Sequence, residues 1–243
     1  MEKIVVANLK MNLTVTEISS YLEDIKEVMN SKKVVICPTS IYLPYFLKQK
    51  YSVGIQNIAM SEEGAFTGEV SANQVSSMGV NYAIVGHSER RQLLGETDAI
   101  VNKKVLMGIR NKLTIILCIG ETKEEKDMFK TDKVLKRQLI NALRDIDIKE
   151  TKNIIIAYEP IWSIGTGNVP ENKDISAITM YIKGIVNNLY HEDVNIPVLY
   201  GGSVNEKNIE ELNKINEISG VLVGGASLKA DKLQKIKEVI IGE

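Results

Sequence analysis

The strongest constraint on this chain is a short apolar segment that recurs eight times, with helical patterns in between. The eight segments are residues 4–7, 34–37, 53–55, 82–85, 114–118, 154–158, 197–200 and 221–223. They are rich in β-branched residues, which favours strands over buried helices. They are apolar throughout rather than alternating, as expected of parallel strands that are covered on both faces.

Helical spacing fills the segments between these runs. Apolar residues three or four positions apart predict a helix over about 15–30, a second after Pro170-Glu171 and a last one over about 233–240. The residues that carry these patterns are Ile18, Tyr21, Leu22, Ile25, Val28 and Met29, then Ile175, Ile178, Ile182, Ile185, Val186 and Leu189, then Leu233, Ile236, Val239 and Ile240. Segment 121–137 is dense in Lys and Glu, and we expect it to be the solvated outer face of a helix rather than a binding surface.

The alternation of strand and helix predicts one (β/α)8 barrel domain over residues 1–243, in the α/β class. A length of 243 residues also fits that fold, which takes about 250. A doubly wound open sheet is the alternative. No linker or break in composition divides the chain, and this favours the closed barrel.

Composition excludes several classes of protein. The chain has 2 Cys, too few for a disulfide framework or a thiolate zinc cluster. A net charge of −1 argues against binding to nucleic acid or to a membrane surface. No apolar run reaches the ~18 residues of a membrane span, and the N-terminus is too short for a signal peptide, so we expect a cytoplasmic protein.

In such a barrel the site lies at the C-terminal ends of the strands. Lys10 follows the first predicted strand, and its ammonium is suited to an anionic substrate. Glu159 ends the sixth predicted strand. Burying a carboxylate there costs free energy unless the group is paired or serves the function. His87 follows the fourth, next to a helix predicted to begin at Ser88. A helix start disfavours the imidazolium, so we expect a neutral ring whose pKa is not raised. The only other histidine, His191, is expected at the surface.

Two glycine pairs point to phosphate. Gly201-Gly202 and Gly224-Gly225 follow the last two predicted strands, whose loops usually hold phosphate in this fold. Segment 160–170 follows Glu159 directly and contains the only Trp of the chain. We interpret it as a hinged lid that contributes backbone N–H groups from its tip.

Taken in order, these motifs resemble the triosephosphate isomerase family over the whole chain. Residues 8–12 are similar to the family's Asn-Trp-Lys-Met-Asn opening. Further matches are segments 86–91, 118–122, 157–160, 164–167, 200–204 and 224–228. The ordered set is far more specific than any one motif. Leu9 in place of Trp, Ser163 in place of a common Ala, and the 168–170 hinge depart from the family pattern.

The resemblance implies interconversion of dihydroxyacetone phosphate and glyceraldehyde 3-phosphate, without metal or cofactor. Glu159 would be the carbon base and His87 the neutral acid. Lys10 would balance charge and Asn8 would help to place the substrate oxygens, with Glu89 as a partner near Lys10. The amides that would hold phosphate are those of Gly165, Ser203, Gly224 and Gly225.

The resemblance also implies a homodimer. Segment 57–71 is the longest connection without a clear element, and it would insert into a second subunit through Phe66 and Thr67.

Two other functions stay open at this point. One is a different sugar-phosphate isomerase, against which Lys10, His87 and Glu159 together argue. The other is a non-catalytic barrel, against which the presence of Glu159 argues. Cys37 and Cys118 are expected to be buried thiols.

Overall fold

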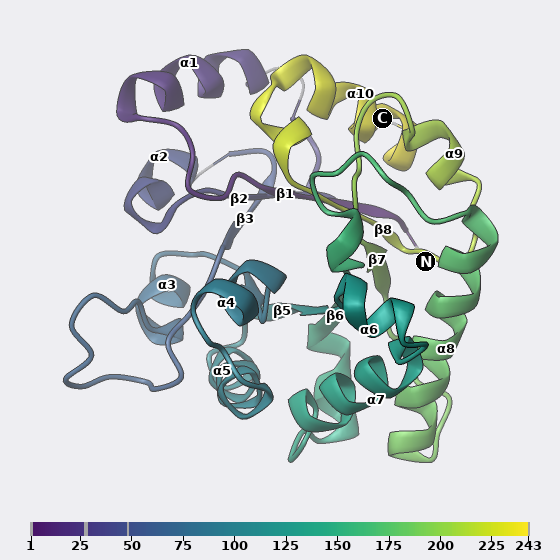
Figure 1. Cartoon of the computed structure of the whole chain (residues 1–243). Helices are drawn as coiled ribbons and strands as arrows, with labels where there is room; N and C mark the ends of the chain where they lie inside the picture. Colours follow the sequence, from purple (N-terminus) through teal and green to yellow (C-terminus); the bar gives the residue numbers. More distant parts are fainter. Residues whose placement is uncertain (1, 27–28, 48, 243) are drawn as a thin grey trace.

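The structure, a computed structural model, describes residues 2–26, 29–47 and 49–242. Parallel strands form one closed barrel in the order β1 to β8, and helices surround it (Figure 1). The predicted (β/α)8 fold is therefore confirmed, and the doubly wound open sheet is excluded. The strands are β1 Ile4–Asn8, β2 Val34–Cys37, β3 Ser52–Ile55, β4 Tyr82–Val85, β5 Thr114–Ile119, β6 Ile154–Tyr158, β7 Val198–Tyr200 and β8 Gly220–Val223.

The helices lie between the strands, as the sequence spacing predicts. The α-helices are α1 Val15–Ile25, α2 Leu43–Phe46, α3 Ala72–Ser77, α4 Ser88–Leu93, α5 Asp98–Arg110, α6 Lys123–Asp127, α7 Thr131–Ala142, α8 Asn172–Tyr190, α9 Ile209–Asn213 and α10 Ala230–Ile241. Short 3-10 helices are η1 Ser40–Tyr42, η2 Ile148–Asn153, η3 Ile161–Ser163 and η4 Gly225–Leu228.

Strand periodicity divides the core in two. Successive strand residues point to opposite faces, so one set fills the barrel and the other packs under the helices. The inner set is Val6, Val35, Cys37, Ile84, Ile116, Cys118, Ile155, Ala157, Leu199 and Leu222. Because Val6 and Ala157 face inward, Asn8 and Glu159, two positions further on, reach the mouth of the barrel. The same period that builds the core thus directs the site residues.

The ring closes where β1 pairs with β8, with Ile4 opposite Gly220. Gly220 has a φ of +135°, a conformation that side chains rarely adopt. A Cβ there would lie 1.9 Å from the Ile4 carbonyl oxygen. Only glycine fits this seam without moving the backbone.

The helix boundaries agree only in part with the sequence predictions. The first helix ends at Ile25, although the Met29 N–H still donates to the Ile25 carbonyl, and Val28 lies outside the described residues. The helix predicted after Pro170-Glu171 is confirmed, because α8 begins at Asn172 with the extended Glu171 as its N-cap. The last helix, α10, begins at Ala230, earlier than the predicted 233.

The charged segment after β5 is only partly as expected. Most of it is exposed on α6 and α7, but its first residue, Glu121, is buried with 1% of its surface exposed.

His191 is exposed and caps α8 in the left-handed conformation. Cys37 and Cys118 are both buried free thiols, as expected. Among the described residues, no helix is long and apolar enough to cross a membrane.

Candidate active site

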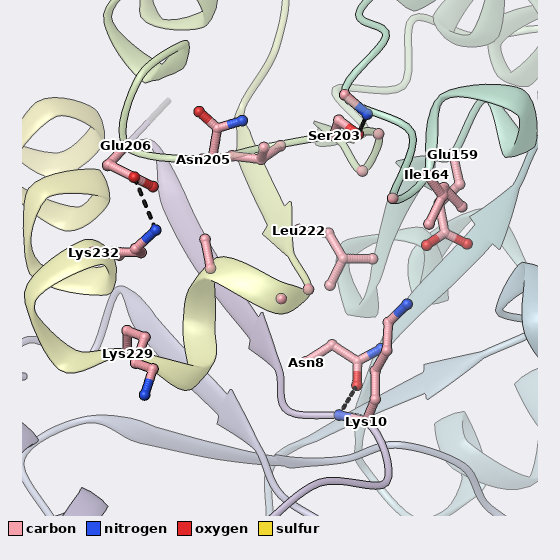
Figure 2. A pocket seen from close by; sticks show the side chains of 18 of the residues that line it. Asn8, Lys10, Glu159, Ile164, Ser203, Asn205, Glu206, Leu222, Lys229 and Lys232 are labelled. Carbon is pink, nitrogen blue, oxygen red and sulfur yellow. Dashed lines mark hydrogen bonds and ion pairs between the residues drawn. The ribbon is translucent and has the colours of Figure 1, made fainter.

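A pocket of about 360 Å³ lies at the C-terminal mouth of the barrel (Figure 2). Eight of the residues selected from the sequence line it together: Asn8, Lys10, His87, Glu159, Gly165, Ser203, Gly224 and Gly225. Glu89 lies outside this pocket, in a neighbouring hollow that also contains Lys10. The structure therefore brings together residues from both ends of the sequence.

Glu159 is the buried carboxylate of the site, with 2% of its surface exposed. One oxygen, Oε1, lies 3.1 Å from Nε2 of His87. The other, Oε2, accepts a 3.2 Å hydrogen bond from the Ser88 N–H at the start of α4. Burial by itself raises the pKa of Glu159, but His87 and the Ser88 N–H together bring this pKa below its ordinary value. The group is thus held as a carboxylate, the form that can accept a proton.

His87 is the N-cap of α4, and its ring accepts a bond from that helix. Nδ1 accepts a 3.2 Å hydrogen bond from the Glu89 N–H. A nitrogen that accepts cannot carry a proton, so in a neutral ring with this contact the proton would lie on Nε2. Nε2–H then donates to Glu159. That the ring is neutral stays a prediction, which this contact permits.

The expectation that the pKa of His87 is not raised is wrong. Burial, the largest single effect, lowers this pKa, but the Glu159 and Glu89 carboxylates together raise it by more, so that it lies above its ordinary value. The helix start was visible in the sequence, whereas the carboxylate is brought to the ring only by the fold. The two groups form one coupled pair, and each stabilises the charged form of the other.

Lys10 reaches into the pocket from the end of β1 (Figure 2). Its Nζ forms a 2.5 Å ion pair with Oε1 of Glu89. Its backbone has a φ of +53°, which is uncommon outside glycine and has to be supported by neighbours. Asn8 Oδ1 accepts from the Lys10 N–H at 3.0 Å, and Gln56 Nε2 donates to the Lys10 carbonyl at 2.8 Å. Thr39 Oγ1 donates to the same carbonyl at 3.1 Å.

The glycines of the pocket have different reasons to be glycine. A Cβ at Gly201 would lie 2.9 Å from Cγ of Glu159, so Gly201 leaves room for the carboxylate. At Gly224 a Cβ would lie 3.3 Å from Cε of Lys10. Gly225 and Gly165 have open space around them and expose their backbone. Both glycine pairs were predicted to bind phosphate, but Gly201 also has a packing role that depends on a contact made only in the fold.

Segment 160–170 is anchored by its tryptophan. Trp162 Nε1 donates to Oε1 of Glu121 at 2.8 Å, and the Tyr158 hydroxyl lies 3.2 Å from both Glu121 oxygens. Nζ of Lys126 lies 3.3 Å from the centre of the Trp162 ring. Burial raises the pKa of Glu121 above its ordinary value despite these donors. Further along, the Gly167 N–H donates to Ser203 Oγ at 3.2 Å, so the segment rests on the loop after β7.

Sequence reasoning missed three supporting residues. Gln56 and Thr39 hold the backbone of Lys10, and Glu121 holds Trp162. Gln56 follows β3 directly, as Lys10 and His87 follow their strands, so its position was a usable clue. Glu121 follows β5 at one residue's distance and could have been found in the same way.

The fold and the site together define the class of protein: a (β/α)8 barrel enzyme that carries a carboxylate, an imidazole and an ammonium at its strand ends, the layout of acid–base chemistry. Sequence comparison narrows the class further. The family model described as triosephosphate isomerase matches residues 3–240. The chain belongs to the triosephosphate isomerase family, and it is accordingly an isomerase. The resemblance seen in the motifs is confirmed.

Relatives with that name are similar over nearly their whole length. A triosephosphate isomerase of Clostridium botulinum (strain Loch Maree / Type A3) is 40% identical over 241 residues, covering 96% of this chain and 97% of its own. One of Dictyoglomus turgidum is 39% identical over 236 residues, covering 93% and 95%. One of Alkaliphilus metalliredigens is 40% identical over 236 residues, covering 94% and 95%.

Proposed function

We propose that the chain interconverts dihydroxyacetone phosphate and D-glyceraldehyde 3-phosphate through an enediolate. The observation that carries this proposal is the pairing of Glu159 with His87, 3.1 Å apart, beside Lys10 in one pocket. A base, a neutral acid and a cation are what a proton transfer next to a carbonyl needs. As a step of glycolysis and gluconeogenesis, the reaction runs in both directions.

In this mechanism Glu159 turns from His87 to the substrate and removes a proton from carbon. The electron pair moves onto the carbonyl oxygen, and the Nε2–H of His87 donates to that oxygen. Lys10 stabilises the negative charge, while Asn8 helps to place the substrate oxygens. Glu89 holds the ammonium of Lys10 in position. His87 then takes the proton of the neighbouring hydroxyl, whose oxygen becomes the new carbonyl, and Glu159 returns its proton to the neighbouring carbon, so both groups regain their starting forms.

The phosphate of the substrate binds to backbone N–H groups on the other side of the pocket, those of Gly165, Ser203, Gly224 and Gly225. Glycine-rich loops and a short helix start are suited to an anion, because their N–H groups point at it. The Ser203 N–H lies 3.3 Å from Ser163 Oγ in the described conformation, so it exchanges that partner for phosphate on binding. Segment 160–170 acts as a lid over this end of the pocket.

Glu159→Gln tests the assignment of the base. The amide keeps the shape of the side chain but cannot take the proton, so turnover should fall by ~10²–10⁴-fold. A coupled assay on glyceraldehyde 3-phosphate measures it. Glu206→Gln is the matched control: Glu206 lines the same pocket but is paired with Lys232 at 3.0 Å, and turnover should persist. Near-normal turnover in Glu159→Gln would refute the mechanism, and no turnover in the unaltered chain would favour a non-catalytic barrel.

We also propose that the chain acts as a homodimer through segment 57–71. This segment contains no helix or strand and projects from the barrel between β3 and α3 (Figure 1). Phe66 near its tip is 43% exposed. A second hollow of about 480 Å³ adjoins Lys10 and is lined by Met11, Leu93 and Leu94 among others. These three side chains are 91%, 77% and 64% exposed, an apolar surface suited to receive the tip of a second copy.

A further inference from the structure

Ser163 is the one polar side chain of the lid that is fully buried. Its exposed fraction is 0%, and it lies at the end of η3, one turn after Glu159. The proposed mechanism gives it no role. It also stands where the resembled family commonly has alanine, so its hydroxyl is a feature of this chain. A buried hydroxyl is costly unless its hydrogen-bonding capacity is used.

All of that capacity is used here. Ser163 Oγ donates to the Asn168 carbonyl at 2.5 Å, because a carbonyl can only accept. It accepts from the Ser203 N–H at 3.3 Å, because an N–H can only donate. It lies 3.2 Å from the Tyr200 hydroxyl, which therefore has to be the donor of that pair. One proton and two lone pairs are thus matched by one acceptor and two donors.

Ser203 completes the connection in the opposite direction. Its Oγ donates to the Ser163 carbonyl at 2.6 Å and accepts from the Gly167 N–H at 3.2 Å. Ser163 and Ser203 together tie both the start and the end of the lid to the loop after β7. We call this set of contacts between Ser163, Ser203, Tyr200, Asn168 and Gly167 the serine clasp.

Gly202 shows how closely the serine clasp is packed. A Cβ at this position would lie 2.2 Å from the Tyr200 hydroxyl and 2.8 Å from Ser163 Oγ. Gly202 has an ordinary φ, so it is glycine for space and not for conformation. Burial raises the pKa of Tyr200 to about 12, which keeps its hydroxyl protonated and able to donate.

We propose that Ser163 is a positioning residue. Its contacts with Asn168 and Tyr200 remain when the Ser203 N–H turns to phosphate, and through them its hydroxyl holds the lid docked at the end of β7 while the enediolate exists. The proposal rests on the isomerase mechanism given above. A docked lid keeps the Gly165 N–H over the substrate phosphate and keeps water out. If the lid lifts, the enediolate can lose its phosphate. The electron pair of the enediolate forms a new carbon–carbon double bond as the C–O bond to phosphate breaks. Inorganic phosphate leaves, and the remaining three-carbon enol becomes methylglyoxal.

The test measures inorganic phosphate released per isomerisation, as a ratio within one reaction. Ser163→Ala removes the hydroxyl and leaves the backbone unchanged. The ratio should rise about tenfold, equivalent to ~1.4 kcal/mol. A purely structural role would lower the melting temperature or the amount of active enzyme but leave this ratio unchanged. The affinity for a phosphate-bearing analogue of the enediolate should fall in parallel.

Two further variants complete the test. Asn168→Ala keeps the carbonyl that Ser163 uses, so the ratio should not change. Tyr200→Phe should raise the ratio, and the double variant Ser163→Ala/Tyr200→Phe should raise it by less than the product of the two single effects, since both remove one shared contact. An unchanged ratio in Ser163→Ala, with normal turnover, overturns the role of Ser163 alone. Failure of the proposed mechanism would instead appear as near-normal turnover in Glu159→Gln, and failure of the proposed reaction as no turnover in the unaltered chain.

Discussion

At the scale of single residues, the site depends on two groups that change each other's protonation. Glu159 has a lowered pKa and His87 a raised one, each because of the other. The contribution of Glu159 to the free energy of unfolding is present when the pH is above the ordinary carboxylate pKa. It is lost as the pH falls through the lowered pKa of Glu159. That of His87 is fully present below the ordinary imidazole pKa and is lost as the pH rises through its raised value. The pair therefore adds stability on the acidic side of neutrality, between these limits.

A titration of His87 checks this coupling. In Glu159→Gln the negative charge is gone, while burial and the Glu89 N–H still oppose the imidazolium, so the pKa of His87 should fall. Nitrogen NMR of the ring follows it directly, with exposed His191 as the internal control. A pKa of His87 that does not move in this variant would contradict the coupling.

The positions of the site residues could be predicted from the sequence, but their contacts could not. Lys10, His87 and Glu159 each follow an apolar run, and parallel strands bring such positions to one face. Whether Glu159 turns to His87, to the Ser88 N–H or to solvent depends on packing by neighbours such as Gly201, which lies far along the chain. Gln56 and Thr39 act through the backbone of Lys10, so nothing in their side-chain chemistry distinguishes them in the sequence.

At the scale of elements, strands were easier to predict than helix ends. The strand positions follow from apolar runs that are too short for helices and rich in β-branched residues. The first helix ends at Ile25 rather than near residue 30, and the last begins at Ala230 rather than near residue 233. Pro170 precedes the extended N-cap Glu171, so it lies outside α8 and within the proposed lid segment.

This position of Pro170 sharpens a prediction about how the lid moves. Proline fixes its own φ and restricts Val169, which is β-branched and packs against the core. Gly167 has a φ of +78° and no Cβ, so it can rotate freely. We expect the large dihedral changes at Gly167 and Asn168. Structures with and without a phosphate-bearing inhibitor measure them, and large changes at Val169 would contradict the prediction.

At the scale of the whole molecule, the barrel explains why one pocket can use distant residues, but it leaves an apolar surface beside Lys10 uncovered. Phe66, near the tip of segment 57–71, is also left 43% exposed. Both observations agree with the proposed homodimer, in which each loop covers the other subunit's hollow.

Phe66→Asp combined with Thr67→Asp tests the dimer. Two carboxylates at the loop tip would have to be buried without partners, so the subunits should separate and activity should fall. Sedimentation at micromolar concentration gives the mass. Lys123→Asp is a control, since this exposed residue lies on α6, away from the loop. A dimer unaffected by the double change, or a monomeric unaltered chain, would exclude this interface.

The pairing of β1 with β8 has a consequence for the chain while it is being synthesised. β1 leaves the ribosome before the other strands, yet one of its edges has no partner until Gly220–Val223 has been made. At ~5–20 residues per second, that edge stays open for roughly 10–40 s. During this time it can pair with another nascent chain, a route to aggregation. The pocket is also incomplete for the same period, because Lys10 and Gly224 meet only when the ring closes.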